Sequence, residues 1–353
     1  MPAFFESGFS VRQPMWHGLG NILDEYPESW DDARLAAGLM WEPTEVPVYT
    51  KTVVTAGTPW PEGATAVGYD AATQPTPGDV LQADVLAFVA SDFKGVARDD
   101  TNDLLGVVSD SWAAVTHGQM GEMLEALLGE DGKVKFETAG VLRGGRSVWA
   151  LCYLDEPYTV PGDESQTYPY IALLNHHDGT GAAKIIPTQV RVVCWNTFSM
   201  ASAEGERTGR QVVIRHSGNV AERIEAAKAS LAELRTDARR YLELADVLAG
   251  VRVDDALVST FLDRFIPAPE NASDRVLANR QERQGEFMAI YNESPTTDGV
   301  RGTAYGLLMT ATEYLDHMRP FRSSDTYLAR TMLRPEPIKA NVLSLVRELA
   351  NVN

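Results

Sequence analysis

The strongest constraint on the fold is a stripe of apolar residues that recur at alternating spacings of three and four. Its members are Ile224, Ala227, Leu231, Leu234, Ala238, Tyr241, Ala245 and Leu248. This spacing lines one side of an α-helix, as in the seam of a coiled coil. A helix of roughly 30 residues, at about 1.5 Å per residue, is about 45 Å long. Ser217 or Asn219 can cap its start, and Gly250 can end it.

Shorter amphipathic helices are expected after this long one. They span Asp254–Phe265, Ser273–Ile290, Thr303–Met318 and Pro337–Leu349. Pro267 and Pro269 stop the first of them, because proline has no N–H with which to continue a helix. Residues 217–353 are therefore predicted to form a mainly helical portion with one long helix.

The residues before this portion have a β-rich pattern. Strands are expected at Val46–Val54, Val85–Ala90, Leu105–Val108, Val134–Leu142, Ser147–Leu154, Tyr168–Leu174, Val190–Trp195 and Gln211–Arg215, and helices at Glu28–Leu39 and Gly118–Leu128. The Gly-, Pro- and Thr-rich stretch 57–79 is predicted to be a loop, and residues 91–104 a hairpin-like connection. Gly144 and Gly145 supply the positive φ of a tight turn. We predict an α+β fold, with an antiparallel β-meander sheet packed against helices in residues 1–216.

The charge of the chain is unevenly distributed. The formal net charge of −18 argues against nucleic-acid binding over the whole surface. Residues 133–216, however, hold nine Lys or Arg and eight Asp or Glu, a net of +1, and the rest of the chain holds 22 and 41, a net of −19. An anionic ligand is repelled least by this middle stretch. The alternative is that sheets simply carry fewer charges than surface helices.

Composition also limits the cellular setting. No apolar run is long enough for a membrane helix, and the first residues, MPAFFESGFSVRQPMW, lack the basic and apolar regions of a signal peptide. Cys152 and Cys194 fit a reducing compartment better than a disulfide framework. We expect a cytoplasmic protein with no membrane contact.

The turn after Leu174 carries the residues most suited to metal chemistry. His176, His177 and Asp178 are candidate metal ligands, with Cys194 as a distant fourth. Adjacent histidines on an extended chain point to opposite faces, so both rarely reach one metal. Asp178 followed by glycine is also ordinary turn chemistry, which favours a structural turn.

Other catalytic patterns are weak. Cys194 could act as a thiol nucleophile with a histidine and Asn196, but a cysteine in the run RVVCW is more often a small buried hydrophobe. Glu313 and His317 share a helix face, and without a second such motif this favours capping or interhelical hydrogen bonds. The sequence has no phosphate-binding loop, dinucleotide-binding fingerprint or Gly-x-Ser-x-Gly elbow. We expect no catalytic residue and no cofactor.

Basic residues near the predicted hairpins are candidates for binding phosphates. They are Arg143, Arg146, Lys184, Arg191 and Arg215, and Trp195 beside them could stack on a base. The alternative is that these are solvated strand-edge charges that discourage pairing with another sheet.

Five segments between Leu105 and His317 carry a family resemblance. They are LGVVSDSWAAV, ETAGVLRGGRSVWAL, NHHDGTGAAKIIPTQVRVVCWNTF, IRHSGNV and GTAYGLLMTATEYLDH. Together they resemble a family of phage- and plasmid-encoded proteins of unknown function that is common in actinobacterial viruses. The resemblance implies a phage or mobile-element origin and a cytoplasmic life, and it implies no catalytic residue. The order of helix, β-meander and long helix is also similar to single-strand-annealing recombinases, which form rings or filaments and hold single-stranded DNA in a basic groove.

These observations lead to one hypothesis and two alternatives. We expect a non-enzymatic phage protein that binds single-stranded DNA and promotes annealing during recombination, as a homo-oligomer. One alternative is a protein that binds a host factor through its acidic surface. The other is a metal-dependent enzyme that uses His176, His177 or Asp178.

Overall fold

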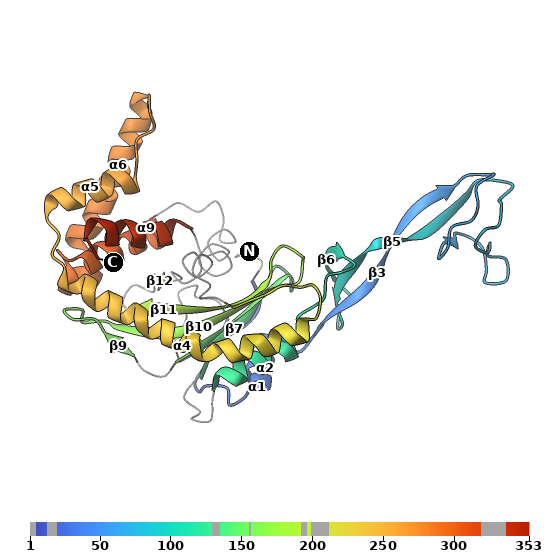
Figure 1. The fold of residues 1–353 in the computed structure, drawn as a ribbon, viewed down its shortest axis with the longest axis horizontal. Helices are drawn as coiled ribbons and strands as arrows, with labels where there is room; N and C mark the ends of the chain where they lie inside the picture. Colours follow the sequence, from blue (N-terminus) through green and yellow to red (C-terminus); the bar gives the residue numbers. More distant parts are fainter. Residues whose placement is uncertain are drawn as a thin grey trace.

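The computed structural model describes residues 5–12, 20–128, 135–154, 157–191, 196–198, 212–318 and 337–352. Within them the chain forms a main sheet covered by helices, a second sheet that extends away as a long arm, and a group of C-terminal helices (Figure 1). The arm and the C-terminal helices lie toward opposite ends of the molecule. The predicted α+β class with a helical C-terminal portion is confirmed.

The main sheet is built around a β-meander. Its strands are β1 (Phe5–Val11), β2 (Asn21–Leu23), β7 (Lys135–Leu142), β8 (Ser147–Tyr153), β9 (Tyr158–Thr159), β10 (Gln166–His176), β11 (Ala183–Arg191), β12 (Asn196–Phe198) and β13 (Val212–Ile214). Their order is β12-β11-β10-β8-β7-β1-β2, with β13 also paired to β11 and β9 to β10. The strands β7, β8, β10 and β11 are successive antiparallel neighbours, which confirms the predicted meander. Its last strand begins at Ala183, seven residues before the predicted start at Val190, because residues 184–190 pair with β10.

Three helices cover one face of this sheet (Figure 1). They are α1 (Trp30–Ala37), α2 (His117–Leu128) and α4 (Val220–Gly250). Trp30 and Met120 pack with Ala139 and Ile171 of the sheet in one apolar core, and full burial of a large apolar side chain stabilises the fold by about 1.5–3 kcal/mol. Gly121 makes room for Trp30, since a Cβ at this position would lie 2.0 Å from the indole ring.

Helix α4 is 31 residues long, as the spacing of its apolar residues predicted. Ile224 and Ala227, near its start, belong to the core of the main sheet. Ala245 and Leu248, near its end, belong to the core of the C-terminal helices. One helix therefore supplies apolar residues to both cores.

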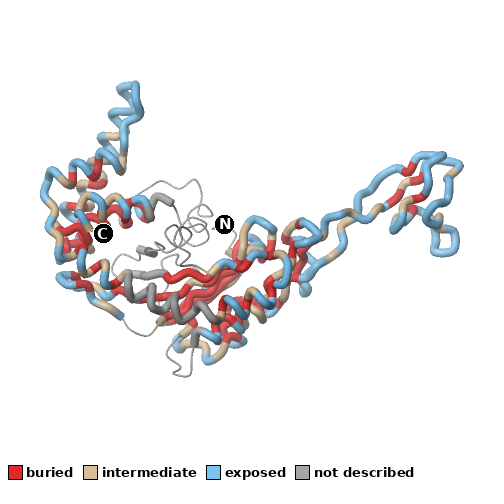
Figure 2. Tube along the Cα trace, in the orientation of Figure 1, coloured by how far each residue is buried: buried red, intermediate tan, exposed pale blue. Residues whose placement is uncertain are grey.

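The C-terminal helices surround α7. They are α5 (Asp255–Phe265), α6 (Asp274–Glu293), α7 (Ala304–Glu313) and α9 (Pro337–Leu349), with a 3₁₀ turn, η1 (Pro295–Val300), and a π turn, η2 (Tyr314–Met318). Residues 304–312 of α7 are all buried, so this helix forms the centre of the second core. The first half of α6, in contrast, is mostly exposed and projects from the body (Figures 1 and 2).

Short polar side chains begin most of these helices. Each accepts a hydrogen bond from a backbone N–H of the first turn, which would otherwise have no partner. The capping residues are Ser29 for α1, Asn219 for α4, Asp254 for α5 and Thr303 for α7. The cap of α4 is thus the second of the two predicted candidates. Ser273 precedes α6 without making such a bond.

The second sheet forms the arm. Its strands are β3 (Pro43–Val54), β4 (Thr65–Ala66), β5 (Val85–Arg98) and β6 (Leu104–Ser109), and β5 pairs with all the others. The prediction of a connection after Ala90 was wrong for residues 93–98, because residues 93–97 pair with β6 and residues 94–98 with β3. Residues 57–79 form the tip, where a small core around Trp60 holds them. Most of the arm is exposed (Figure 2).

A buried ion pair joins η2 to α9. The Nζ of Lys339 lies 2.8 Å from Oδ2 and 2.6 Å from Oδ1 of Asp316, and each side chain is 6% exposed. Removing one partner of such a pair leaves the other charge in apolar surroundings, which is costly even where the intact pair adds little.

We expect Lys339→Met to lower the free energy of unfolding by about 3 kcal/mol, because Asp316 would keep a buried charge without a partner. Adding Asp316→Leu should recover part of the loss. Arg264→Met is the matched control: its partner is Glu348 on α9, but both side chains are largely exposed, so stability should change little. Urea denaturation compares the three variants. A Lys339→Met protein as stable as the unaltered chain would contradict this account.

Candidate functional site

Four of the predicted phosphate-binding residues lie at one end of the main sheet. Two lie in the turn between β7 and β8, one near the start of β11 and one just after β13: Arg143, Arg146, Lys184 and Arg215. β8 begins at Ser147 opposite His176, and β11 begins at Ala183 opposite Ile214. Because antiparallel neighbours reverse direction, these turns meet at the same edge.

These basic side chains differ in their surroundings. Arg146 and Arg215 are exposed, and Lys184 is half-buried. The Nη1 of Arg143 lies 3.5 Å from Oδ2 of Asp178 in the neighbouring β10–β11 turn, and the Arg143 side chain is 41% exposed. Arg143 is therefore held in place while part of its guanidinium still faces solvent. We call Arg143, Arg146, Lys184 and Arg215 the basic edge.

Two other predicted residues are not part of this edge. Arg191 ends β11, opposite Thr167. It is seven residues from Lys184, roughly 23 Å along an extended strand at about 3.3 Å per residue. The strand therefore places Arg191 at the opposite end of the sheet from Lys184, and its predicted phosphate-binding role stays a prediction apart from the basic edge. Trp195 and Cys194 lie outside the described residues.

The β7–β8 turn has the left-handed backbone that its sequence predicted. Gly144 and Gly145 have φ of 66° and 91°, and Arg143 before them has φ of 57°. A Cβ on Gly145 would lie 2.8 Å from the indole ring of Trp41, so glycine lets the turn pack on this tryptophan. The basic edge is thereby anchored to the segment that leads into β3 and the arm.

The paired histidines point to opposite sides, as predicted. His177 is fully buried, whereas His176 is half-buried and hydrogen-bonded to Ser147 Oγ at 3.0 Å. Asp178 makes the predicted turn, with Oδ1 accepting from the backbone N–H of Thr180 at 3.1 Å.

A buried pair of imidazoles lies beneath the basic edge. His117 Nδ1 lies 2.7 Å from the carbonyl oxygen of Trp41, so this nitrogen must carry the proton and donate it. His117 Nε2 is then an acceptor, 3.2 Å from Nε2 of His177, which must donate. The Nδ1 of His177 is left as a buried lone pair without a hydrogen-bond partner among the described residues. Trp41 contacts both rings edge-on.

Burial keeps these histidines neutral. Loss of hydration lowers the pKa of His117 to about 4, and it lowers the pKa of His177 well below its ordinary value. His216, next to Arg215, stacks on Trp112 and has its pKa lowered to about 4 for the same reason. At neutral pH these three rings add no positive charge near the basic edge.

The predicted metal ligands do not converge. His176 and His177 face different surroundings, and Asp178 pairs with Arg143. Over the part of the chain that the structure describes, no three His, Cys, Asp or Glu side chains come together in a group that could hold a metal ion.

The root of the arm is fixed to the main sheet by a charged network. The Arg98 guanidinium lies 4.4 Å from the ring centroid of Trp41. It also pairs with Asp100, with Nε–Oδ1 and Nη2–Oδ2 distances of 2.9 and 2.8 Å, and with Glu6 of β1. A guanidinium can stack on a ring and donate to carboxylates at once, so one side chain joins β5 to β1.

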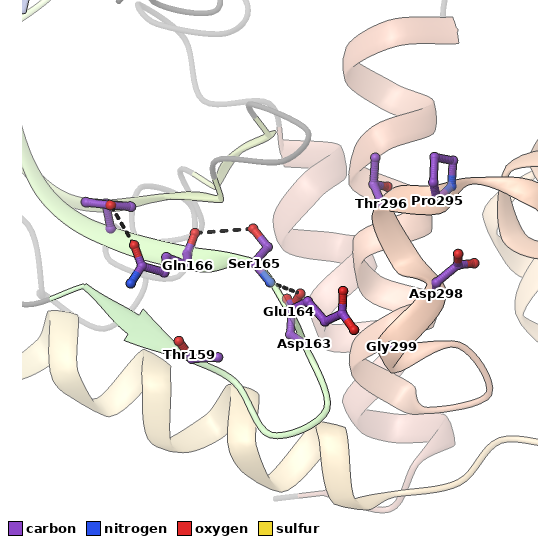
Figure 3. Close-up of a pocket in the computed structure, with 10 residues that line it drawn as sticks. Thr159, Asp163, Glu164, Ser165, Gln166, Pro295, Thr296, Asp298 and Gly299 are labelled. Atoms are coloured by element: carbon purple, nitrogen blue, oxygen red, sulfur yellow. Dashed lines mark hydrogen bonds between the residues drawn. The ribbon is translucent and has the colours of Figure 1, made fainter. Parts of the chain in front are cut away.

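A separate cleft lies between the β9–β10 connection and η1 (Figure 3). It has a volume of about 1070 Å³, and its acidic lining residues are Asp163, Glu164 and Asp298. Its two walls touch at Gly162 and Gly299, where a Cβ on Gly299 would lie 2.0 Å from the Gly162 carbonyl oxygen.

Glu313 supports the same wall of this cleft. Its carboxylate accepts from Ser294 Oγ at 2.9 Å and from Thr296 Oγ1 at 2.5 Å. The predicted hydrogen-bonding role for Glu313 is confirmed. Its bonds hold the start of η1 against the end of α7.

No pattern in the sequence pointed to the pair of buried imidazoles or to the cleft. His117 and Trp41 are single residues far from His177 in sequence, and no spacing pattern connects them. The two walls of the cleft are separated by roughly 130 positions, so only the folded chain brings them together.

The architecture is that of an α+β protein with a β-meander sheet, a long covering helix and a basic sheet edge. A family model described as "Domain of unknown function (DUF932)" matches residues 104–333. Because this match covers more than half of the chain, the protein belongs to the DUF932 family. Neither curated proteins nor solved structures gave a match. Among the described residues, none of the helices is both long and apolar enough to cross a bilayer.

The buried histidines predict an acid-sensitive stability. Their folded pKa values lie below the ordinary 6.5, so as pH falls the unfolded chain binds protons first. The free energy of unfolding is therefore unaffected by these histidines above about pH 6.5. It falls as the pH is lowered toward 4, by up to about 1.4 kcal/mol per pH unit for each ring.

We expect His117→Gln to remove the contribution of one imidazole to this pH dependence. The unfolding free energy of the variant should therefore fall less steeply between pH 6.5 and 4 than that of the unaltered protein. Above pH 7 the difference between the two proteins should be constant, which serves as the internal control. Urea denaturation at a series of pH values measures both slopes. Equal slopes would show that His117 is not kept neutral by burial.

Proposed function

We propose that this protein binds single-stranded DNA through its basic edge and promotes annealing, and that it does so without catalysing a reaction. The observation that carries the proposal is that four basic residues from three separate segments gather at one end of the sheet in a chain of net charge −18. Clustered cations in an acidic protein localise a polyanion to one place and keep it off the rest of the surface.

The supporting chemistry is that of phosphate recognition. Arginine presents a planar fork of donors that matches two phosphate oxygens, and lysine adds a point charge. Arg143 is already oriented by Asp178, so less conformational freedom is lost when it meets a phosphate.

The wider setting of the proposal is recombination in a phage-infected or plasmid-bearing bacterium, in the host cytoplasm. It is supported by the similarity between the β-meander with its long helix and the order of elements in single-strand-annealing recombinases. Because this is an analogy at the level of the fold only, the proposal is tested by measuring the binding of single-stranded DNA.

We expect fluorescent oligo-dT to bind at low salt and to dissociate as salt is raised, because neutralised phosphates release their counterions. Arg143→Ala with Arg146→Ala should weaken binding by at least about tenfold and reduce the salt slope by about 0.7 for each phosphate that is no longer neutralised. Fluorescence anisotropy across a salt series measures both quantities.

The matched control is Arg275→Ala with Arg283→Ala, which removes the same charge from exposed positions of α6. This control should bind as the unaltered protein does. Absence of oligo-dT binding at every salt concentration would overturn the proposal. Equal weakening by the two double variants would show that binding reports only the overall charge and not the basic edge.

A second candidate function is favoured by the acidic cleft of Figure 3. Asp163, Glu164 and Asp298 line a space that could receive a basic segment of a host protein. Such a host-factor complex would make the acidic surface, and not the basic edge, the functional one.

For this candidate we expect a host protein to co-purify from a nuclease-treated lysate and to be absent from the eluate of Glu164→Gln with Asp298→Asn. Asp274→Asn with Glu282→Gln, on exposed α6, removes the same charge elsewhere and should retain the partner. Quantitative mass spectrometry compares the eluates. A partner that disappears on nuclease treatment would instead indicate bridging by nucleic acid.

A further inference from the structure

The far end of the arm is a small three-stranded sheet with one covered face. Cross-strand neighbours in an antiparallel sheet share a face, and successive residues alternate. Val54, Val85 and Ala87 point to one side, where they pack with Trp60 and Ala66 of the tip. This side forms the small core that holds the tip.

The opposite face has apolar side chains but no cover. Its rows, read along the strands from the body outward, are Tyr49 with Ala90, then Lys51 with Phe88 and Thr65, then Val53 with Leu86 and Val67. Four of these side chains are large, apolar and strongly exposed: Tyr49 51%, Val53 51%, Phe88 40% and Val67 39%. We call this surface the open arm face.

Such a face is unusual for a sheet with one side in water. Antiparallel strands with one solvated face normally alternate apolar and polar residues, whereas strands covered on both sides are apolar throughout. The exposed residues here adjoin one another on paired strands and do not lie singly. Contiguous exposed apolar surface of this kind marks an interaction site.

Two charges flank the centre of the open arm face symmetrically. Lys51 precedes Val53 by two residues on β3. Asp84 lies directly before the antiparallel strand β5, two residues before Leu86, and its Oδ1 accepts a hydrogen bond from the backbone N–H of Ala56 at 2.9 Å. Val53 and Leu86 form one cross-strand pair. The positive and negative charges therefore lie on opposite sides of this pair, each roughly 7 Å away along its strand. Both charged residues are exposed.

We propose that the open arm face packs against the same face of a second copy of this chain, around a two-fold axis that passes over the pair of Val53 and Leu86. A two-fold interface uses the same patch on both subunits, so the patch must complement itself. Rotation about this axis reverses the strand direction and brings Lys51 opposite Asp84 of the partner subunit. The apolar rows cover each other, and the two ion pairs fix the register.

The charge of the tip also favours a protein partner over nucleic acid. Residues 55–84 contain four acidic residues and no Lys or Arg, a net charge of −4: Glu62, Asp70, Asp79 and Asp84. A polyanion would be repelled by this end of the arm even though aromatic rings are present. A second copy of the same chain, in contrast, finds an oppositely charged residue on each side of the pair of Val53 and Leu86.

The size of the face predicts a weak association. Three strands about 4.8 Å apart and three rows about 7 Å apart span on the order of 300 Å² per copy. Stable protein interfaces bury about 1,200–2,000 Å² in total. We therefore expect a dimer that forms at high protein concentration and dissociates on dilution.

Sedimentation velocity over a wide range of protein concentration tests the proposal. Lys51→Asp or Asp84→Lys alone should raise the dimer dissociation constant by about tenfold, because each dimer then carries two repulsive pairs in place of two attractive ones. The double variant Lys51→Asp with Asp84→Lys should restore association. An equal mixture of the two single variants should also restore it, since the heterodimer has both pairs of opposite charge.

Phe88→Ser provides a second, independent variant, and Leu35→Ser on α1 is its control at an exposed apolar residue elsewhere. Phe88→Ser should weaken the dimer and Leu35→Ser should not. A chain that stays monomeric at every concentration, or a dimer that neither charge reversal affects, would overturn the proposal. Loss of oligo-dT binding by Phe88→Ser without any change in sedimentation would overturn it too, because it would assign the face to nucleic acid.

Discussion

The architecture depends on the burial of one apolar stripe along α4. The start of this helix packs against the main sheet through Ile224 and Ala227, and its end packs among the C-terminal helices through Ala245 and Leu248. Apolar area removed from water is the dominant stabilising term in folding. Because a single helix supplies this area to both cores, the sheet and the C-terminal helices are connected by a continuous hydrogen-bonded element.

The meander places two turns that are distant in sequence side by side at one end of the sheet. Strands β7, β8, β10 and β11 reverse direction in succession, so the turns at 143–146 and 177–182 emerge at the same edge. Arg143 and Asp178 tie these turns together, and Trp41 and the imidazoles of His117 and His177 support them from below. The positive charge at this edge then comes from arginine and lysine, since the buried rings are neutral.

The arm has a different physical character from the body. Its root is fixed by Arg98, which stacks on Trp41 and pairs with Glu6 and Asp100. Beyond the root, two long strands extend without a helix over either face (Figure 1). The tip has a small core of its own around Trp60, while the open arm face keeps apolar residues in water.

Much of the local structure could be predicted because it depends on neighbours in sequence. The three-and-four spacing indicated the long helix, Asn219 and Ser29 indicated caps, and Gly144 with Gly145 indicated a tight turn. The prediction failed where pairing with a distant strand decides the outcome. Ser91 and Asp92 are polar and resemble the start of a loop, yet the strand continues through them to Arg98, because residues 93–97 pair with β6.

The sequence by itself determined which segments are helix, that a β-meander forms before the long helix, and which residue types could hold phosphate. The tertiary structure alone decided which of them meet. Arg191 is separated from the other basic residues because β11 carries it to the far edge of the sheet. His117 and His177, 60 positions apart, form one hydrogen bond. Both outcomes follow from strand register and long-range packing, which are cooperative properties of the whole chain and leave no local pattern in the sequence.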